Sequence, residues 1–337
     1  MLDLNRKEIN FIGYRKVFLS ISCVLVVLSL CFIAFKGLDF GTEFTGGSTI
    51  TFLGQEQMSS ADDAGSATEL TEASVRDALN SAGYNGELVI QTVQSGNSTG
   101  FLAQLSTTDV QECESYAVAA AETLGISTDD VQVSTIGPNW GANVVRTSAI
   151  AFAISILAII AYIWIRFKDY KMGVTAIIAL LHDIIIVVGI YALAGREVTP
   201  NAIAALLTIM GYSLYDTIVV FHRINDNVTS GAVKHSFWTI ANHSINQTLT
   251  RTINTTLTSL VPVLAMLFFG GATLQDFAFA MSVGLICGSY SSIAVASPIY
   301  AIWKKREKGI EALEERYGTS VITDTRVVLA GLPVKAS

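Results

Sequence analysis

A single carboxylate, Asp216, interrupts an apolar segment (201–222) that is long enough to cross a membrane. An ionised carboxylate in hydrocarbon costs at least about 2.5 kcal/mol, and such residues usually lie on ion or proton routes. Asp216 precedes Arg223 by seven residues, which places it about 10 Å into the membrane. Arg251 lies near the inner end of the next apolar segment, and its long side chain can reach further into the membrane. These positions predict an Asp216–Arg251 pair on an ion or proton route, with a buried structural contact as the alternative.

Other polar residues recur every three or four positions in the same two segments, which places them on one face of each helix. This predicted polar face comprises Thr208, Tyr212, Gln247, Asn254 and Thr255. Asp183 is a further candidate for proton coupling, about 16 Å beyond Met172 and so near mid-membrane; a structural role is its alternative. His182 and Asp183 are adjacent, so their side chains leave the helix about 100° apart and are not expected to face one site.

Small residues form a Gly-x-x-x-Gly motif at Gly284 and Gly288, followed by Ser289, Ser291 and Ser292. Small side chains at this spacing let a second membrane helix approach closely. We therefore expect Gly284 and Gly288 to pack against another helix.

The composition indicates a membrane protein, since 51% of the residues are hydrophobic, 15% are charged and the mean hydropathy is +0.50. Soluble domains carry about 25% charged residues. The sequence has no P-loop, no dinucleotide fingerprint and no metal-ligand spacing of Cys or His. We therefore expect no enzyme activity, no cofactor, no metal and no nucleic-acid partner. Any transport must draw its energy from an ion gradient or from a partner protein.

Hydropathy predicts an α-helical polytopic membrane protein with six transmembrane helices. The expected parts are an N-terminus at 1–16, a first span at 17–35, an α/β domain at 36–143, a five-helix bundle at 144–303 and a tail at 304–337. The bundle spans are expected at about 144–165, 172–194, 201–222, 249–269 and 278–303. In the tail we expect one short helix and no pattern in the last 15 or so residues.

Charge is distributed unevenly between the regions. Residues 37–143 contain 15 acidic residues and one basic residue, Arg76, a net charge of −14. Basic residues cluster before the first span, after the second and after the sixth. The positive-inside rule therefore places both termini in the cytoplasm and the acidic domain outside. Alternating strand and helix patterns in that domain predict the order β-α-β-β-α-β, with a polar link at 55–70.

Several long motifs resemble the SecF branch of the SecD/SecF family of protein-export membrane proteins, which is related to the resistance-nodulation-division superfamily. They are GLDFGTEFTGGS after the first span, ALLHD in the third, AALLTIMGYSLYDTIVVFHRINDN in the fourth, INQTLTRTINTTLTSLVPVLAMLFFGG in the fifth and GSYSSIAVASP in the sixth. The resemblance covers about residues 8 to 305.

The resemblance implies an accessory subunit of the Sec translocase in the bacterial cytoplasmic membrane. With SecD it would use the proton motive force to promote late steps of protein export. It implies as partners SecD, the SecYEG channel, SecA indirectly, exported unfolded polypeptides and membrane lipids. Asp216 and Arg251 match the family's proton-linked carboxylate and arginine.

The chain departs from the family pattern near this site, with Tyr215 where Asn is common and His222 where Asp is common. Glu43 and Ser48 stand where Asp and Thr are usual. Two alternative functions are a structural subunit that conducts no protons and a small-molecule or lipid exporter of the same superfamily. Exporters of that kind usually have two six-span halves in one chain, whereas this chain has one.

Overall fold

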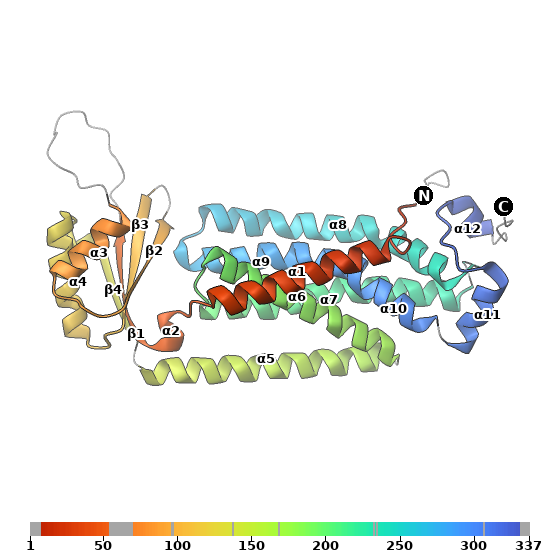
Figure 1. Cartoon of the computed structure of the whole chain (residues 1–337), viewed down its shortest axis with the longest axis horizontal. Coiled ribbons are helices and arrows are strands. Elements are labelled where there is room, and N and C mark those ends of the chain that lie inside the picture. The colour runs from red at the N-terminus through yellow and green to blue at the C-terminus, as the bar shows by residue number, and fades with distance from the viewer. Residues whose placement is uncertain are drawn as a thin grey trace, which may run out of the picture.

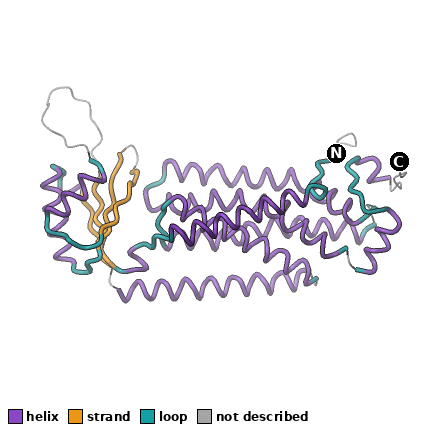
Figure 2. The backbone as a smooth tube through the Cα atoms, viewed as in Figure 1, coloured by secondary structure: helices purple, strands orange, loops and turns teal. Residues whose placement is uncertain are grey.

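The computed structural model describes residues 8–53, 70–95, 98–136, 138–167, 169–231, 233, 235–305 and 307–330. Long helices form a bundle, and a small α/β domain lies at one end of it (Figure 1). The strands lie in that domain, and the bundle is helical (Figure 2). The predicted fold class, six membrane-spanning helices with a small α/β domain, is confirmed.

Six segments are long and apolar enough to cross a membrane. Five are the single helices α1 (Arg15–Lys36), α5 (Pro138–Phe167), α6 (Tyr170–Ala194), α7 (Pro200–Thr229) and α8 (Phe237–Phe269). The sixth combines α9 (Ala272–Ser291), a π-helical turn η2 (Ser292–Ala296) and α10 (Ser297–Lys304). The helices extend beyond the predicted spans, because hydropathy detects only the lipid-crossing part. For example, α8 begins after its N-cap Ser236, whose side chain accepts the Thr239 N–H.

The α/β domain has a four-stranded antiparallel sheet in the order β2-β3-β1-β4. Its elements are α2 (Thr42–Thr45), β1 (Gly47–Leu53), α3 (Glu72–Ser81), β2 (Leu88–Ser95), β3 (Ser98–Leu105), α4 (Val110–Leu124), η1 (Thr128–Asp130) and β4 (Val131–Ile136). The main elements follow the predicted order. Helices α3 and α4 cover the sheet face that points away from the bundle (Figure 1). The predicted polar link at 55–70 lies almost entirely outside the described residues.

Local signals position the two helices of this domain. Thr71 caps α3 in a capping box with Ser74. Asp109 caps α4 by accepting backbone N–H groups, and Gly125 ends the helix in the left-handed conformation at φ 69°. The apolar faces of both helices then pack on alternate residues of the sheet, such as Ile50 and Phe52 of β1, which are fully buried.

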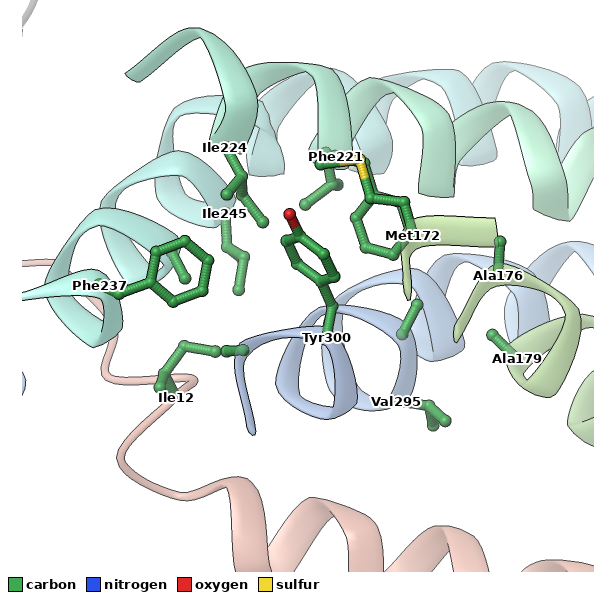
Figure 3. Packing of buried hydrophobic residues seen from close by; sticks show 14 of the residues in the cluster. Ile12, Met172, Ala176, Ala179, Phe221, Ile224, Phe237, Ile245, Val295 and Tyr300 are labelled. Atoms are coloured by element: carbon green, nitrogen blue, oxygen red, sulfur yellow. The ribbon is translucent and has the colours of Figure 1, made fainter. Parts of the chain in front are cut away.

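The largest apolar cluster of the bundle lies at the end that carries the termini. Tyr300 of α10 packs there against Phe221 of α7 and Phe237 of α8 (Figure 3). Ile12 joins this cluster from the segment before α1, and Met172 joins it from α6. The cluster therefore joins five parts of the chain.

The two termini cover the start of α8. The Glu8 N–H donates to the Thr323 carbonyl at 2.9 Å, and the Glu8 carboxylate bonds to the buried His243. The tail contains α11 (Lys308–Tyr317), which matches the predicted short helix, and α12 (Thr325–Ala330). The sequence of this region shows no pattern that predicts α12. The buried Val328 explains this helix, because a tertiary contact with the bundle stabilises a segment too short to fold alone.

Helices α7 and α9 approach each other closely at two glycines. A Cβ at Gly284 would overlap the Ile209 side chain. A Cβ at Gly288 would lie 2.9 Å from Ser213 Cβ and 3.1 Å from its Cα. The backbones of α7 and α9 are therefore closer at Gly288 than any larger residue allows.

We expect Gly288→Ala to destabilise the bundle by about 1–3 kcal/mol, because α7 and α9 must separate to admit the methyl group. Thermal unfolding in detergent measures the change. Gly211→Ala is the matched control, since a Cβ at Gly211 meets no atom within 4 Å. The control should be neutral or slightly stabilising, by roughly 0.5–1 kcal/mol. Equal effects of the two substitutions would contradict the close approach.

Candidate functional site

Asp216 faces a small cavity between α7 and α9 and is 7% exposed. The cavity measures about 10 Å³ and is lined by Tyr212, Ser213, Gly284, Leu285, Gly288 and Ser289. That volume is close to the least that holds one water molecule. Within the described part of the chain, no side chain donates a hydrogen bond to the Asp216 carboxylate. The carboxylate is therefore buried, without a direct partner and next to a space for about one water.

Arg251 lies near Asp216 but does not form the predicted ion pair. Its guanidinium donates to the Tyr215 hydroxyl at 2.5 Å and lies 5.3 Å from the centre of the Tyr215 ring. The interaction with Asp216 is electrostatic, without contact. Tyr215 neighbours Asp216 on α7 and points outward, so it holds the guanidinium at the bundle surface. Depth along the helices predicted the proximity, but it could not reveal a competing hydroxyl.

Asp183 is fully buried where α6, α7 and α9 meet. Ser213 Oγ donates to its Oδ2 at 2.6 Å, and Ser291 Oγ donates to the same oxygen at 2.7 Å. His182 Nδ1 lies 2.9 Å from Oδ1. These hydrogen bonds replace the water that an exposed carboxylate would bind, and they join the three helices.

The expectation that His182 and Asp183 face different sites is wrong. The Cα–Cβ bonds diverge, but the imidazole is long enough to turn back to the neighbouring carboxylate. Cys287 joins them, and the ligand atoms of all three lie within 4.8 Å of one another. His, Cys and Asp are residue types that bind zinc. In this structure the two serines donate to Asp183 Oδ2 and His182 lies against Oδ1, so the described residues form a hydrogen-bonded cluster.

Ser213 connects the surroundings of the two carboxylates. Its hydroxyl binds Asp183, and the same residue lines the cavity beside Asp216. Its carbonyl accepts from Thr217 at 3.2 Å and from Ser292 at 3.4 Å, at the start of the π-helical turn. From the sequence, these serines of the sixth span are expected only to pack as small residues. Their spacing shows which helix face they share, but it does not show which helix lies opposite that face.

The predicted polar face lies on the outside of the bundle. Thr208, Tyr212 and Asn254 are exposed, and Thr255 and Gln247 are half-buried. The Tyr212 hydroxyl bonds to Ser259, which connects α7 to α8 along this face. His222 is also exposed, with Nδ1 3.5 Å from Asp226. The Thr208 and Thr255 hydroxyls donate to carbonyls of their own helices. The Asn254 side chain has no partner among the described residues, and lipid cannot satisfy it at membrane depth. It therefore requires water or another protein.

We expect Ser291→Ala to lower the stability of the bundle by about 1.5–3 kcal/mol, because it removes a hydrogen bond to a buried carboxylate. Ser282→Ala is a matched control on the same helix, since the Ser282 hydroxyl bonds only to the Ala278 carbonyl of its own helix. Chemical unfolding in detergent gives both values. A loss no larger for Ser291→Ala than for Ser282→Ala would contradict a stabilising role of the Asp183 hydrogen bonds.

Residues 117–306 match the sequence profile of the family described as "Protein export membrane protein SecD/SecF, C-terminal". The chain is 36% identical to the protein translocase subunit SecF of Streptomyces coelicolor, over 91% of this chain and 80% of that protein. It is also 36% identical to the SecDF subunit of Thermus thermophilus, over 90% of this chain and 40% of that longer protein.

The fold is likewise similar to a solved structure. The crystal structure of SecDF from Thermus thermophilus, described as a translocon-associated membrane protein, superposes with a TM-score of 0.78 at 34% identity. The match covers 91% of this chain and 40% of that one. The profile, the extent of the sequence similarity and the shared fold agree, and the chain belongs to the SecD/SecF family of protein-export membrane proteins.

Proposed function

We propose that this chain acts as a SecF-type subunit that, together with SecD, couples proton movement to protein export. The observation that carries the proposal is the buried Asp216, which has no hydrogen-bond donor among the described side chains and faces a cavity for about one water. An ionised carboxylate is costly at this depth. Taking up a proton removes the cost, so the position favours alternation between two protonation states as water access changes.

The proposed role of Arg251 is to respond to the charge on Asp216. Its guanidinium bonds to the Tyr215 hydroxyl, one residue from Asp216 along α7. When Asp216 is ionised, the carboxylate competes with this hydroxyl for the guanidinium, because a charge-assisted hydrogen bond is stronger than a neutral one. Protonation returns Arg251 to Tyr215. Such an exchange would shift α8 relative to α7.

Asp183 is proposed as a second carboxylate on the proton route. Ser213 can relay a proton between the water beside Asp216 and the Asp183 carboxylate, because a hydroxyl both donates and accepts. His182 lies beyond Asp183, and its buried Nε2 has no partner among the described residues. This order, Asp216, Ser213, Asp183 and His182, extends from the cavity into the bundle.

SecD is the proposed cover of the outward polar face. Arg251 and Asn254 are exposed on α8, at a depth where lipid offers them no hydrogen bonds. The Thermus thermophilus SecDF relative is more than twice as long as the part that this chain covers. A second set of membrane helices packed on this face would satisfy these groups and exclude lipid from the Asp216 site.

The proposed orientation places both termini in the cytoplasm and the acidic α/β domain outside a bacterial cytoplasmic membrane. The charge distribution supports it, since residues 37–143 have a net charge of −14 and the basic clusters lie at the opposite helix ends. In this orientation the domain would meet exported unfolded polypeptides after they leave the SecYEG channel. The SecA motor would act earlier, from the other side of the membrane.

We expect Asp216→Asn to abolish proton-dependent export, because the amide keeps the shape of the side chain but cannot take up and release a proton. The measurement is export of a secreted reporter in cells, together with proton flux in vesicles, after membrane insertion and SecD association of the variant are verified. Asp226→Asn is the matched control on the same helix, because Asp226 is exposed near the helix end and its change should leave export intact.

Unchanged export in the Asp216→Asn variant would overturn the proposal. The chain would then be a structural subunit of the translocon that conducts no protons, and the buried carboxylate would serve only the packing of α7.

A further inference from the structure

A further buried carboxylate, Glu197, lies at the junction between the α/β domain and the bundle. It belongs to the turn between α6 and α7 and is 8% exposed. Gln104 of β3 reaches it from the α/β domain and donates a hydrogen bond from its side-chain amide. The Thr42 N–H at the start of α2 also donates to it. Glu197 thus belongs to the bundle but receives its hydrogen bonds from the domain.

The backbone is paired at the same junction. The Val198 N–H donates to the Asp39 carbonyl at 2.7 Å, and the Gly41 N–H donates to the Val198 carbonyl at 3.0 Å. Phe40 and Val198 form a short parallel bridge. Figure 1 shows the chain passing from α1 through α2 into the sheet at this end of the bundle. Contacts of Glu197 and its neighbour Val198 therefore hold the domain in place.

The charged groups around Glu197 are either acidic or bonded to other groups. They are Lys36, Asp39, Glu43, Arg196 and Asp276. Arg196 forms an ion pair with Asp276 at 2.8 Å and lies over the Phe279 ring. Lys36 donates to the Leu193 carbonyl at 2.9 Å. Among the described residues no cation forms an ion pair with Glu197.

Glu43 of α2 lies close to Glu197. A Cβ at Gly41 would overlap a carboxylate oxygen of each residue, so the two side chains converge on the space that this glycine leaves empty. Like charges at this distance repel, and burial weakens the screening by water. Burial and the nearby Glu43 charge together raise the pKa of Glu197 to about 7, against the lowering effect of the hydrogen bond from Gln104.

We propose that Glu197 is a proton-binding site that holds the α/β domain against the bundle. With a proton, the carboxyl group is neutral, accepts from Gln104 and can donate to Glu43. Without the proton, the buried Glu197 and the half-buried Glu43 carry two negative charges that face each other across the junction and favour separation of the domain from the turn. The site lies outside the membrane-spanning helices and is separate from Asp216.

The direction of the pH effect follows from the two states of Glu197. Its pKa is about 7 when the domain is docked, and separation returns it toward the ordinary value of 4.5. The docked state binds the proton more tightly, so docking is strongest at pH values below both pKa values of Glu197. As the pH rises between the two values, the ratio of docked to separated molecules falls by up to about tenfold per unit.

The experiment measures the distance between the domain and the bundle as a function of pH. Nitroxide labels are introduced as unnatural amino acids at Gln111 of α4 and Leu274 of α9, both exposed, which leaves the native cysteines in place. The full chain is studied in lipid nanodiscs by pulsed electron spin resonance from pH 5 to pH 8. We expect the short distance to dominate at pH 5, a population of longer distances that grows up to about pH 7, and little further change to pH 8.

Variants assign the effect to Glu197. Glu197→Gln resembles the protonated form and should keep the short distance at every pH. Glu43→Gln removes the repulsion between the two carboxylates. The domain should then stay docked to a higher pH than in the unmodified chain, or at every pH tested. Glu122→Gln is the matched control, since Glu122 is exposed on α4, and it should keep the wild-type pH profile.

A distance that does not change with pH in the unmodified chain would overturn the proposal. A wild-type pH profile in Glu197→Gln would overturn it equally. The measurement involves no transport, so its result is independent of whether Asp216 conducts protons.

Discussion

Asp183 is enclosed by α6, α7 and α9, where two serine hydroxyls and an imidazole replace the water that its carboxylate would otherwise bind. A buried carboxylate without such donors would destabilise the bundle. This requirement sets the rotation of all three helices, because each must present a donor or the carboxylate itself toward one point. The hydrogen bonds form only if α7 and α9 approach closely, and this approach requires glycines on α9.

Helix α7 carries polar side chains on two sides, one that faces the inside of the bundle and one that faces outward next to α8. Ser213 points into the bundle and completes the hydrogen bonds of Asp183. Tyr212 and Tyr215 point outward and bond to side chains of α8. Asp216 lies between these sides, in the cavity that the small residues of α9 leave open. Ser213 is therefore paired inside the bundle, whereas the outer face exposes Arg251 and Asn254, which lipid cannot hydrogen-bond.

The two ends of the molecule are joined to the bundle by different physical means. At the end that carries the termini, aromatic and aliphatic side chains around Tyr300 form an apolar cluster (Figure 3). At the other end, the α/β domain is held by backbone pairing at Val198 and by the carboxyl group of Glu197. Both ends contain a buried carboxylate, but Glu8 bonds to an imidazole, whereas Glu197 faces a second carboxylate, Glu43. Like charges repel, so pH-dependent movement is expected at the domain rather than at the termini.

The six spans, the order of elements in the α/β domain and the family could be predicted from the amino-acid sequence, because hydropathy, capping residues and long motifs are local signals. The sequence also indicated that Asp216 and Arg251 lie near each other. Tertiary structure decided that Tyr215 binds the arginine, that serines of α7 and α9 bind Asp183, and that Glu197 lies at a domain junction. These outcomes depend on the rotation of each helix about its axis and on contacts between residues far apart in the chain, which helical periodicity alone does not specify.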